Sequence, residues 1–237
     1  MRGADFARIR LVLGRSAHFN RLQPAALDRL AALARLRHVP HGDRIGTAAA
    51  RDEHLWIVVS GAVRISTHPR AGSPECVHAV LGAGSYFGLA NAVRHGPFTF
   101  EARAFGATDL AVIDGERLFV ILEQHPRLWR FVSGMLARRF KLALSVIEDN
   151  RVRPLPERAA RRLLSHAMTS ELMDGAQPEL RMTQGDLARM LGAGRSRINT
   201  LLNRLQAQGL LVTGYRTIKL NDLARLRELA GDGVTAF

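Results

Sequence analysis

Residues 182–205 read MTQGDLARMLGAGRSRINTLLNRL, and this stretch decides the fold of the carboxyl-terminal part of the chain. Thr183 can cap a helix, and Asp186 stands three residues later in the position of a capping box. The glycine-rich stretch 192–194 ends that helix, since glycine permits the positive φ of a tight turn. A second helix follows, with apolar residues at i, i+3, i+4 and i+7: Ile198, Leu201, Leu202 and Leu205. The pattern predicts a helix-turn-helix.

The other side of the second helix is polar and basic. It carries Arg195, Ser196, Arg197, Asn199, Thr200, Asn203 and Arg204. Side chains of these types can donate to phosphates and reach base edges. An ordinary helical hairpin with a solvated polar face has the same periodicity, so the helices alone do not decide between the two.

The residues after the second helix favour DNA binding. Residues 210–220, LLVTGYRTIKL, have the pattern of strand, turn and strand. A β-hairpin directly after a recognition helix is the layout of a winged helix. Arg216 and Lys219 would lie on this wing, near a DNA backbone.

Bulk composition agrees with a polyanionic partner but does not locate its site. The 237 residues suffice for two modest domains. The formal net charge is +13, from 34 Lys and Arg against 21 Asp and Glu. From residue 151 onward the chain has 14 basic and 8 acidic residues, so the basic excess extends over both halves.

Several classes of protein are not expected. The single cysteine, Cys76, excludes an intramolecular disulfide and a cysteine cluster for zinc or iron–sulfur. No apolar run approaches the ~18 residues of a membrane span, and the first residues do not resemble a secretory signal. We therefore expect a soluble cytoplasmic protein with no membrane partner. No catalytic motif or metal site is found, and scattered histidines are interpreted as surface or capping residues: His18, His38, His41, His54 and His166.

The amino-terminal half has the texture of a β-structure. Short apolar runs separated by glycine fill residues 38–114, at the spacing of a β-sandwich or barrel. Examples are 55–65, LWIVVSGAVRI, and 76–82, CVHAVLG, while residues 110–113 form the last expected strand. Before this region, residues 19–36 have a helical pattern, with Pro24 in a first-turn position.

A helical region follows, beginning with a short helix over 116–124. A long helix is predicted from Leu128 to about Arg151, with apolar residues on more than one face. Such a helix needs two partners: its own β-domain, and plausibly the same helix of a second subunit in a coiled coil. The dimerisation candidates are Leu128, Phe131, Val132, Met135, Leu136, Phe140, Leu144 and Ile147. The alternative is a helix buried within a monomer. Residues 151–156 are interpreted as a hinge, and 157–168 as the next helix.

The order of β-roll, long helix, hinge and winged helix-turn-helix resembles the Crp–Fnr family of bacterial transcription regulators. Residues 84–88, GSYFG, resemble the family's lead into its effector loop, and Met135–Arg139 resembles a piece of its dimer helix. Residues 183–205 match the DNA-binding motif best. The resemblance implies an α+β fold with three parts: a jelly-roll-like effector domain over 1–124, a dimerisation helix and hinge over 125–153, and a winged helix-turn-helix domain over 154–237.

The same resemblance implies a homodimer that binds a palindromic site in double-stranded DNA, with half-sites ~34 Å apart, and RNA polymerase as a further partner. Carried over by position, the base-reading residues are Arg195, Ser196 and Thr200. Thr183 at the start of the motif is a further candidate for DNA binding. Members that respond to cyclic AMP have Glu and Arg at the second and third of these positions, so we expect a different half-site here. The competing hypothesis is an effector-sensing module whose output is contact with another protein.

The effector region departs from the pattern of cyclic-AMP-binding members. Those place Glu after the loop glycine Gly88, Arg-Ser about ten residues on, and Thr-Ser on the long helix. This chain has Leu89, then Phe98-Thr99, then Ala143-Leu144 at the aligned positions. Leucine cannot accept from a ribose hydroxyl and phenylalanine cannot neutralise a phosphate. Cyclic AMP bound through the usual contacts is therefore not expected.

Other effectors stay open. Haem is conceivable through Cys76, His78 or His95, because Cys76 and His78 would share one face of a strand. The favoured interpretation of Cys76 and His78 is a buried thiol and an ordinary histidine. A cyclic dinucleotide could be held by Arg94, Arg103 or arginines of the long helix. A regulator without a small effector is the remaining alternative, with the former pocket filled by Leu89, Phe98 and Phe100.

Overall fold

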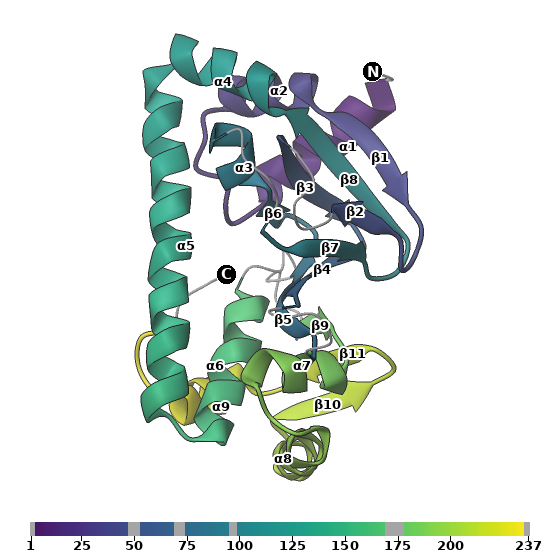
Figure 1. Cartoon of the computed structure of the whole chain (residues 1–237), viewed down its shortest axis with the longest axis vertical. Coiled ribbons are helices and arrows are strands. Elements are labelled where there is room, and N and C mark those ends of the chain that lie inside the picture. Colours follow the sequence, from purple (N-terminus) through teal and green to yellow (C-terminus); the bar gives the residue numbers. More distant parts are fainter. Residues whose placement is uncertain (1–2, 47–52, 69–73, 95–98, 169–177, 235–237) are drawn as a thin grey trace. The chain divides into compact units, whose positions relative to one another are not determined.

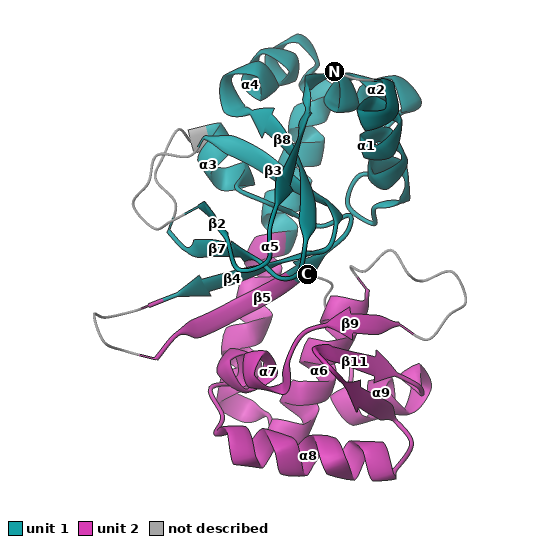
Figure 2. Ribbon diagram, turned by 90° about the vertical axis from the view of Figure 1, so that its right-hand side faces the viewer, with its two compact units in different colours: residues 1–67, 81–138 teal, residues 68–80, 139–237 magenta. Residues whose placement is uncertain are grey.

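The structure, a computed structural model, describes residues 3–46, 53–68, 74–94, 99–168 and 178–234 (Figure 1). The chain separates into two compact units (Figure 2). The first contains residues 1–67 and 81–138, and the second contains residues 68–80 and 139–237. This division passes through the long helix, whereas the resemblance suggested boundaries at either end of it.

The first unit combines helices with antiparallel sheets. It begins with α1 (Gly3–Arg15) and α2 (Pro24–Leu33). One four-stranded sheet has the order β1-β8-β3-β6, from β1 (Arg35–Val39), β3 (His54–Ser60), β6 (Tyr86–Phe87) and β8 (Thr108–Asp114). The other has the order β2-β7-β4-β5, from β2 (Arg44–Gly46), β4 (Ala62–Thr67), β5 (Cys76–Gly82) and β7 (Glu101–Ala104). Residues 76–80 of β5 are counted with the second unit. The β-structure predicted between residues 38 and 114 is confirmed.

Strand β3 is buried on both faces and organises the core of this unit. Its residues Leu55, Ile57 and Val59 belong to an apolar cluster with residues of α1, α2 and α4. Trp56 and Val58 are also buried, on the opposite face, because successive side chains of a strand alternate. Gly61 has a φ of +79° between β3 and β4, and a Cβ there would collide with the backbone of residues 107 and 108. The apolar run at residues 55–65 therefore forms two strands, β3 and β4, around a turn glycine.

Three helices follow in sequence around and after this roll: α3 (Leu89–Arg94), α4 (Gly115–Gln124) and α5 (Pro126–Val152). The carboxylate of Asp114 caps α4 by accepting from the backbone N–H of Arg117 at 3.1 Å. The first part of α5 packs on the core through Leu128, Val132 and Met135. Helices α4 and α5 lie where the sequence predicts them.

The second unit contains the predicted helix-turn-helix and wing. Its elements are α6 (Leu155–Ala167), β9 (Glu179–Arg181), α7 (Gln184–Leu191), α8 (Arg195–Ala207), β10 (Leu211–Gly214), β11 (Thr217–Leu220) and α9 (Leu223–Ala230). The strands form one antiparallel sheet in the order β10-β11-β9. The α+β class and the winged helix-turn-helix are thus confirmed. Among the helices of the described ranges, none has the length and apolar character needed to cross a membrane.

The helix predicted over residues 19–36 is shorter than expected. Residues 24–33 form α2, and β1 begins at Arg35. Gln23 is extended, with φ −60° and ψ 146°, because a following proline disfavours helical backbone. Ala34 is also extended, with ψ 146°, and its conformation starts the strand. Helices α1, α3 and α9 and strand β9 were not predicted.

Two of the five histidines interpreted as surface residues are buried. His18 is 7% exposed, and its ring packs edge-on against Tyr86 with 5.0 Å between centroids. His166 on α6 is 4% exposed. The pKa of His166 is lowered to about 3 in the folded chain. Burial is the main cause of this pKa shift, and the nearby positive charge of Arg162 contributes to it. The surface interpretation is wrong for both: His166 lies on α6, which is packed nearly all round, and His18 packs against Tyr86 of the first unit's core.

Candidate DNA-binding interface and effector region

The helix-turn-helix begins with a complete capping box. The Thr183 hydroxyl accepts from the backbone N–H of Asp186 at 3.0 Å, and the Asp186 carboxylate accepts from the backbone N–H of Thr183 at 3.0 Å. That carboxylate also accepts from the Thr183 hydroxyl at 2.6 Å and from the guanidinium of Arg189 at 3.0 Å. The buried carboxylate of Asp186 therefore has several donors, and Thr183 serves to cap α7.

The turn between the two helices has the geometry that its glycines suggest. Gly192 is the C-cap of α7 in the left-handed region, with φ 59° and ψ 32°. Its N–H donates to the Ala188 carbonyl, and the N–H of Ala193 donates to the same carbonyl at 3.0 Å. A residue with a Cβ would be strained at Gly192. The turn thereby fixes the direction in which α8 leaves α7.

Helix α8 has one buried and one exposed face. Ile198, Leu201, Leu202 and Leu205 are buried, as their helical spacing predicts. All seven polar candidates on this helix are exposed: Arg195, Ser196, Arg197, Asn199, Thr200, Asn203 and Arg204. The face has three guanidinium groups and no carboxylate. It can therefore donate to phosphates and to base acceptors without a competing internal acid.

The wing extends this polar surface. Strands β10 and β11 pair from Leu211↔Leu220 to Gly214↔Thr217, which leaves Tyr215 and Arg216 as a two-residue turn. Arg216 has a φ of 57°, and its guanidinium lies 5.3 Å from the centre of the Tyr215 ring. Arg216 and Lys219 are both exposed, as expected for backbone contacts.

A side chain of α8 links the recognition helix to the wing. The amide oxygen of Gln206 accepts from the backbone N–H of Thr213 at 2.9 Å and from its hydroxyl at 3.1 Å. These bonds hold β10 against the end of α8. Gln206 was interpreted only as part of the helix end, and Tyr215, which is 86% exposed at the turn, was not singled out. An aromatic residue in a polar hairpin turn is the signal that could have identified it.

Most effector candidates of the first unit that the structure describes have a structural role in the turn, the core or an ion pair. Gly88 has a φ of +79°, and a Cβ there would collide with the His54 carbonyl and crowd Trp56. Leu89 is 4% exposed and belongs to the apolar core. Arg103 donates to the Glu101 carboxylate and, at 3.2 Å, to the Gly42 carbonyl. Thr99 is exposed.

The remaining effector candidates lie outside the described residues or on the part of α5 that belongs to the second unit. Phe98 and His95 lie outside the described residues, and so does the side chain of Arg94 at the end of α3. Ala143 and Leu144 are exposed positions of α5 in the second unit.

The two potential haem ligands on β5 have neighbours in the second unit. Cys76 and His78 lie on the same side of β5, as the strand period predicts, and His78 is the more exposed of the two. Partial desolvation of the ring lowers the pKa of His78, and the positive charge of Arg162 on α6 lowers it too. No group of three or more His, Cys, Asp and Glu side chains within the described ranges is placed to hold a metal ion.

The dimerisation candidates on α5 divide into two sets. Leu128, Val132 and Met135 are buried in the core of the first unit, and Phe131 and Leu136 pack against that core. Phe140, Leu144 and Ile147 are 65%, 50% and 51% exposed. The spacing i, i+4, i+7 places these three on one face of the helix. Within one chain, this second apolar face faces solvent.

Comparison with known proteins identifies both parts of the chain. A family model for the Crp-like helix-turn-helix domain matches residues 157–229, and a model for the cyclic nucleotide-binding domain matches residues 36–125. The chain belongs to the Crp–Fnr family of transcription regulators. It is a DNA-binding regulator rather than an enzyme, as its relatives in this family are.

Relatives cover nearly the whole chain. The Cyclic AMP receptor protein of Thermus thermophilus is 27% identical over 213 residues, which cover 90% of this chain and 95% of the relative. The CRP-like cAMP-activated global transcriptional regulator of Mycobacterium tuberculosis is 23% identical over 221 residues, covering 92% and 98%. Among solved structures, FixK2 from Bradyrhizobium japonicum is similar in fold, with a TM-score of 0.71 at 21% identity over 84% of this chain and 98% of that chain.

Proposed function

We propose that this Crp–Fnr regulator acts in the cytoplasm as a homodimer that binds a palindromic operator and contacts RNA polymerase. The observation that carries the proposal is the exposed face of α8, where Arg195 and its polar neighbours project from a helix that follows the capped helix α7 and is bonded to the wing at its end. A module whose output is only protein contact has no need of such a face. Double-stranded DNA is the partner that the chemistry favours.

The second apolar face of α5 supports the homodimer. Phe140 is 65% exposed and Leu144 and Ile147 are half exposed. Monomeric proteins rarely leave a contiguous apolar stripe of this kind in water. The same helix from a second chain, related by a twofold axis, would cover it. A twofold dimer presents two recognition helices, which is why the operator is expected to be palindromic.

The operator is expected to differ from that of the cyclic-AMP-responsive members. Arg195 can pair bidentately with the O6 and N7 acceptors of guanine, which is worth roughly 1–3 kcal/mol of discrimination. Ser196 and Thr200 have shorter side chains that discriminate bases less strongly. We therefore expect the strongest sequence preference at the base pair facing Arg195.

We further propose that cyclic AMP does not act on this chain through the family's usual contacts, although two of the relatives above are named for it. Leu89 is buried in the apolar core at the position of the ribose-binding Glu, and Ala143 and Leu144 have no polar side-chain group for adenine. Isothermal titration of the full chain with cyclic AMP checks this. We expect no heat of binding up to millimolar concentration; micromolar binding would contradict it.

The DNA-binding proposal is tested by selecting duplexes from a random pool and titrating the enriched sequence by fluorescence anisotropy. We expect an enriched palindrome bound at least 10³-fold more tightly than random duplex. The logarithm of the affinity should fall linearly with the logarithm of salt concentration, because phosphate contacts release counterions. Failure to enrich any sequence, with no binding even at low salt, would instead favour a protein–protein output.

A further inference from the structure

The connection between α5 and α6 has little free length. Two residues separate the helices, within the segment 151–156 that the sequence suggested as a hinge. One of them, Arg153, donates from its Nε to the Asp149 carboxylate at 3.1 Å and from a terminal nitrogen to the Glu157 carboxylate at 3.0 Å. Its backbone N–H also donates to the Asp149 carbonyl at 3.1 Å. Arg153 therefore joins the last turn of α5 to the first turn of α6.

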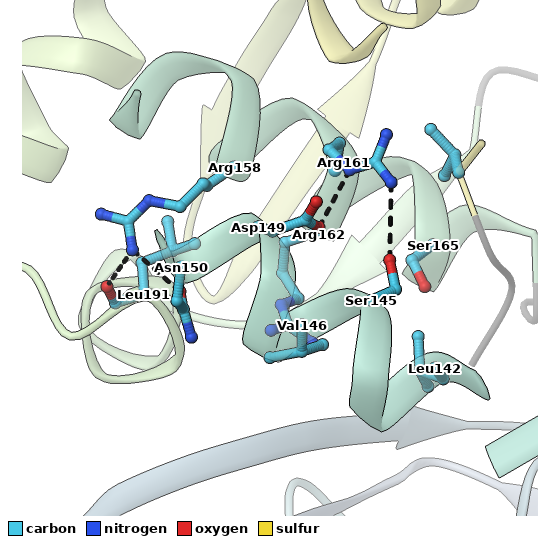
Figure 3. A pocket seen from close by; sticks show the side chains of 11 residues that line it. Leu142, Ser145, Val146, Asp149, Asn150, Arg158, Arg161, Arg162, Ser165 and Leu191 are labelled. Atoms are coloured by element: carbon cyan, nitrogen blue, oxygen red, sulfur yellow. Dashed lines mark hydrogen bonds and ion pairs between the residues drawn. The ribbon is translucent and has the colours of Figure 1, made fainter. Parts of the chain in front are cut away.

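A buried arginine of α6 makes a second connection (Figure 3). Arg161 is 6% exposed, and its Nε donates to the Asp149 carboxylate at 2.9 Å. Its terminal nitrogens donate to the backbone carbonyls of Asp232 at 2.7 Å and Gly233 at 3.0 Å, in the segment that follows α9. One guanidinium group on α6 thus bonds both to α5 and to the chain after α9. The Asp149 carboxylate compensates its buried charge.

A further arginine of α6 links α5 to the helix-turn-helix. One terminal nitrogen of Arg158 donates to the Asn150 side-chain oxygen at 2.8 Å and to the Leu191 carbonyl at 3.3 Å (Figure 3). Asn150 belongs to α5, whereas Leu191 is the last residue of α7 and directly precedes the turn at Gly192. This turn sets the direction in which α8 leaves α7. Arg158 therefore connects the end of α5 to the turn that orients the proposed DNA-binding face.

Arginine is suited to fixing the relative orientation of several elements. Its guanidinium group holds five N–H donors in one plane, so it can bond acceptors from different segments at once only in a narrow range of geometries. A rotation of α6 against α5 would leave buried donors and carbonyl groups without partners, which is costly. It would also separate the buried Arg161 charge from the Asp149 carboxylate. We therefore expect one arrangement of these elements to be strongly favoured.

Two opposite faces of α5 meet different partners in the second unit. The face toward α6 carries Leu142, Ser145, Val146 and Asp149. The exposed apolar face, proposed above for the dimer contact, carries Phe140, Leu144 and Ile147. At about 3.6 residues per turn, the centres of these faces lie roughly half a turn apart. A partner helix can therefore cover the apolar face while α6 stays bonded to the other.

We propose that Arg158 and Arg161 are positioning residues that fix the winged helix to the end of α5, so that the dimer contact sets the distance between the two recognition helices. The effect on DNA rests on the proposed function. Each half-site must meet one recognition helix, so a rigid connection makes binding depend on the spacing of the half-sites. A free hinge at 151–156 would instead let one dimer accept several spacings.

The first test compares operators that differ only in half-site spacing. One added base pair moves a half-site by about 3.4 Å and rotates it by about a tenth of a turn. We expect the unchanged chain to bind the selected operator about tenfold or more tightly than the operator lengthened by one base pair. In Arg158→Met with Arg161→Met, this ratio should fall to about threefold or less, while affinity for a single half-site stays within about twofold.

The matched control is Arg227→Met, which removes an exposed arginine of α9 and should keep the spacing ratio of the unchanged chain. A role in stability alone would weaken binding to both operators and to the single half-site alike. An unchanged spacing ratio in the double variant would therefore overturn the proposal. If the double variant does not fold, Arg158→Met is measured alone, since methionine retains an apolar stem of similar length.

A second measurement needs neither DNA nor the dimer. Spin labels are attached at Lys141→Cys on α5 and Gln208→Cys at the end of α8, both exposed positions, in a chain with Cys76→Ser. Labelled chains are diluted with unlabelled chains, so that pulsed electron resonance reports distances within one chain. We expect one narrow distance distribution in the unchanged background and with Arg227→Met, and a broader one with Arg158→Met.

The label distances separate failure of this inference from failure of the proposed function. If the unchanged chain selects no palindrome, the proposed function fails, and the distance distributions still decide whether the winged helix is fixed to α5. A broad distribution in the unchanged background would overturn the inference. An equally narrow distribution after removal of the Arg158 guanidinium would overturn its positioning role.

Discussion

Asp186 shows how much structure one residue can organise. It closes the capping box with Thr183 and accepts from Arg189, all while buried at the start of α7. The sequence alone predicts this pair, since a capping box depends on local spacing. The extra bond from Arg189 was not expected, although Arg189 stands one helical turn after Asp186.

Removing the cap should weaken the second unit. We expect Thr183→Ala to lower the free energy of unfolding by about 1 kcal/mol, because the helix loses the acceptor for an unpaired backbone N–H. Urea denaturation followed by circular dichroism measures the change. Thr183→Ser keeps the hydroxyl and should stay within a few tenths of a kcal/mol of the unchanged protein. Equal losses in both variants would show that the methyl group matters instead.

His166 gives stability a dependence on pH. Its pKa is lowered from 6.5 to about 3 in the folded chain, mainly by burial. The unfolded chain therefore binds the proton more readily between these values, so stability is fully present above pH 6.5 and falls as the pH drops toward 3. The expected slope is about 1.4 kcal/mol per pH unit within that window. His166→Gln should remove this slope.

The control for this prediction is His68→Gln, which replaces an exposed histidine of the same unit. Its pH profile of unfolding should keep the slope of the unchanged protein. If His166→Gln retained the full slope as well, the pH dependence would have to arise from another group.

Arg216 has a strained backbone conformation, and we expect its side chain to contact DNA. Its φ of 57° is the left-handed region, which non-glycine residues seldom occupy. We expect Arg216→Gly to leave the free energy of unfolding unchanged or raise it by up to about 1 kcal/mol. DNA affinity should fall, with the salt slope reduced by about one contact. Arg216→Asn should behave similarly; undiminished DNA affinity in both variants would exclude a wing contact at this residue.

At the scale of elements, periodic pattern was the reliable guide. Helix α8, the β10–β11 hairpin and β3–β4 were predicted because their apolar residues repeat at one period over a full element. The shortened helix at 24–33 was missed because Leu36 continues an apolar pattern across a proline-imposed change of conformation. Strand β9 is three residues long and pairs with β11 over a large sequence separation, so no local signal marks it.

Helix α5 shows what a single sequence cannot separate. Its apolar residues were rightly placed on more than one face, but which of them meet the chain's own core depends on tertiary packing. The structure puts Leu128, Val132 and Met135 in that core and leaves Phe140, Leu144 and Ile147 exposed. The proposed dimer contact narrows to these last three.

A charge on the exposed face of α5 should therefore disrupt the dimer without unfolding the chain. We expect Phe140→Glu to convert the protein from the mass of two chains to that of one in light scattering, because the partner's apolar face would meet a carboxylate. The control is Val152→Glu: Val152 is 70% exposed on α5 but lies about a third of a turn from Phe140 by helical geometry. Dimerisation in both variants would place the interface elsewhere.

At the scale of the whole molecule, the fold and the DNA-binding class could be predicted from the sequence, whereas the effector could not. The proposed DNA-binding surface is made of exposed residues on one helix and one hairpin, so sequence order reveals it. The effector region is defined by what fills a core: Leu89 is buried with the apolar cluster, and Arg103 is engaged by Glu101. The burial of Leu89 and the pairing of Arg103 depend on neighbours distant in sequence, which is why the alternatives for the effector stayed open at the level of the sequence.

The burial of polar residues on α6 was missed for the same reason. Arg161, Ser165 and His166 are buried, with exposed fractions of 6%, 4% and 4%, although a sequence pattern assigns such residues to the surface. Their partners come from β5, α5 and the chain after α9.

Sequence-specific recognition by α8 can be decided by one comparison, the affinity of Arg195→Ala for the selected operator and for random duplex DNA. If Arg195 reads a guanine, the variant should lose roughly 1–3 kcal/mol at the operator, about tenfold or more, and much less on random DNA. Its preference at the facing base pair should also disappear. An equal loss on both duplexes would show that Arg195 contacts only phosphates and would contradict base reading by this helix face.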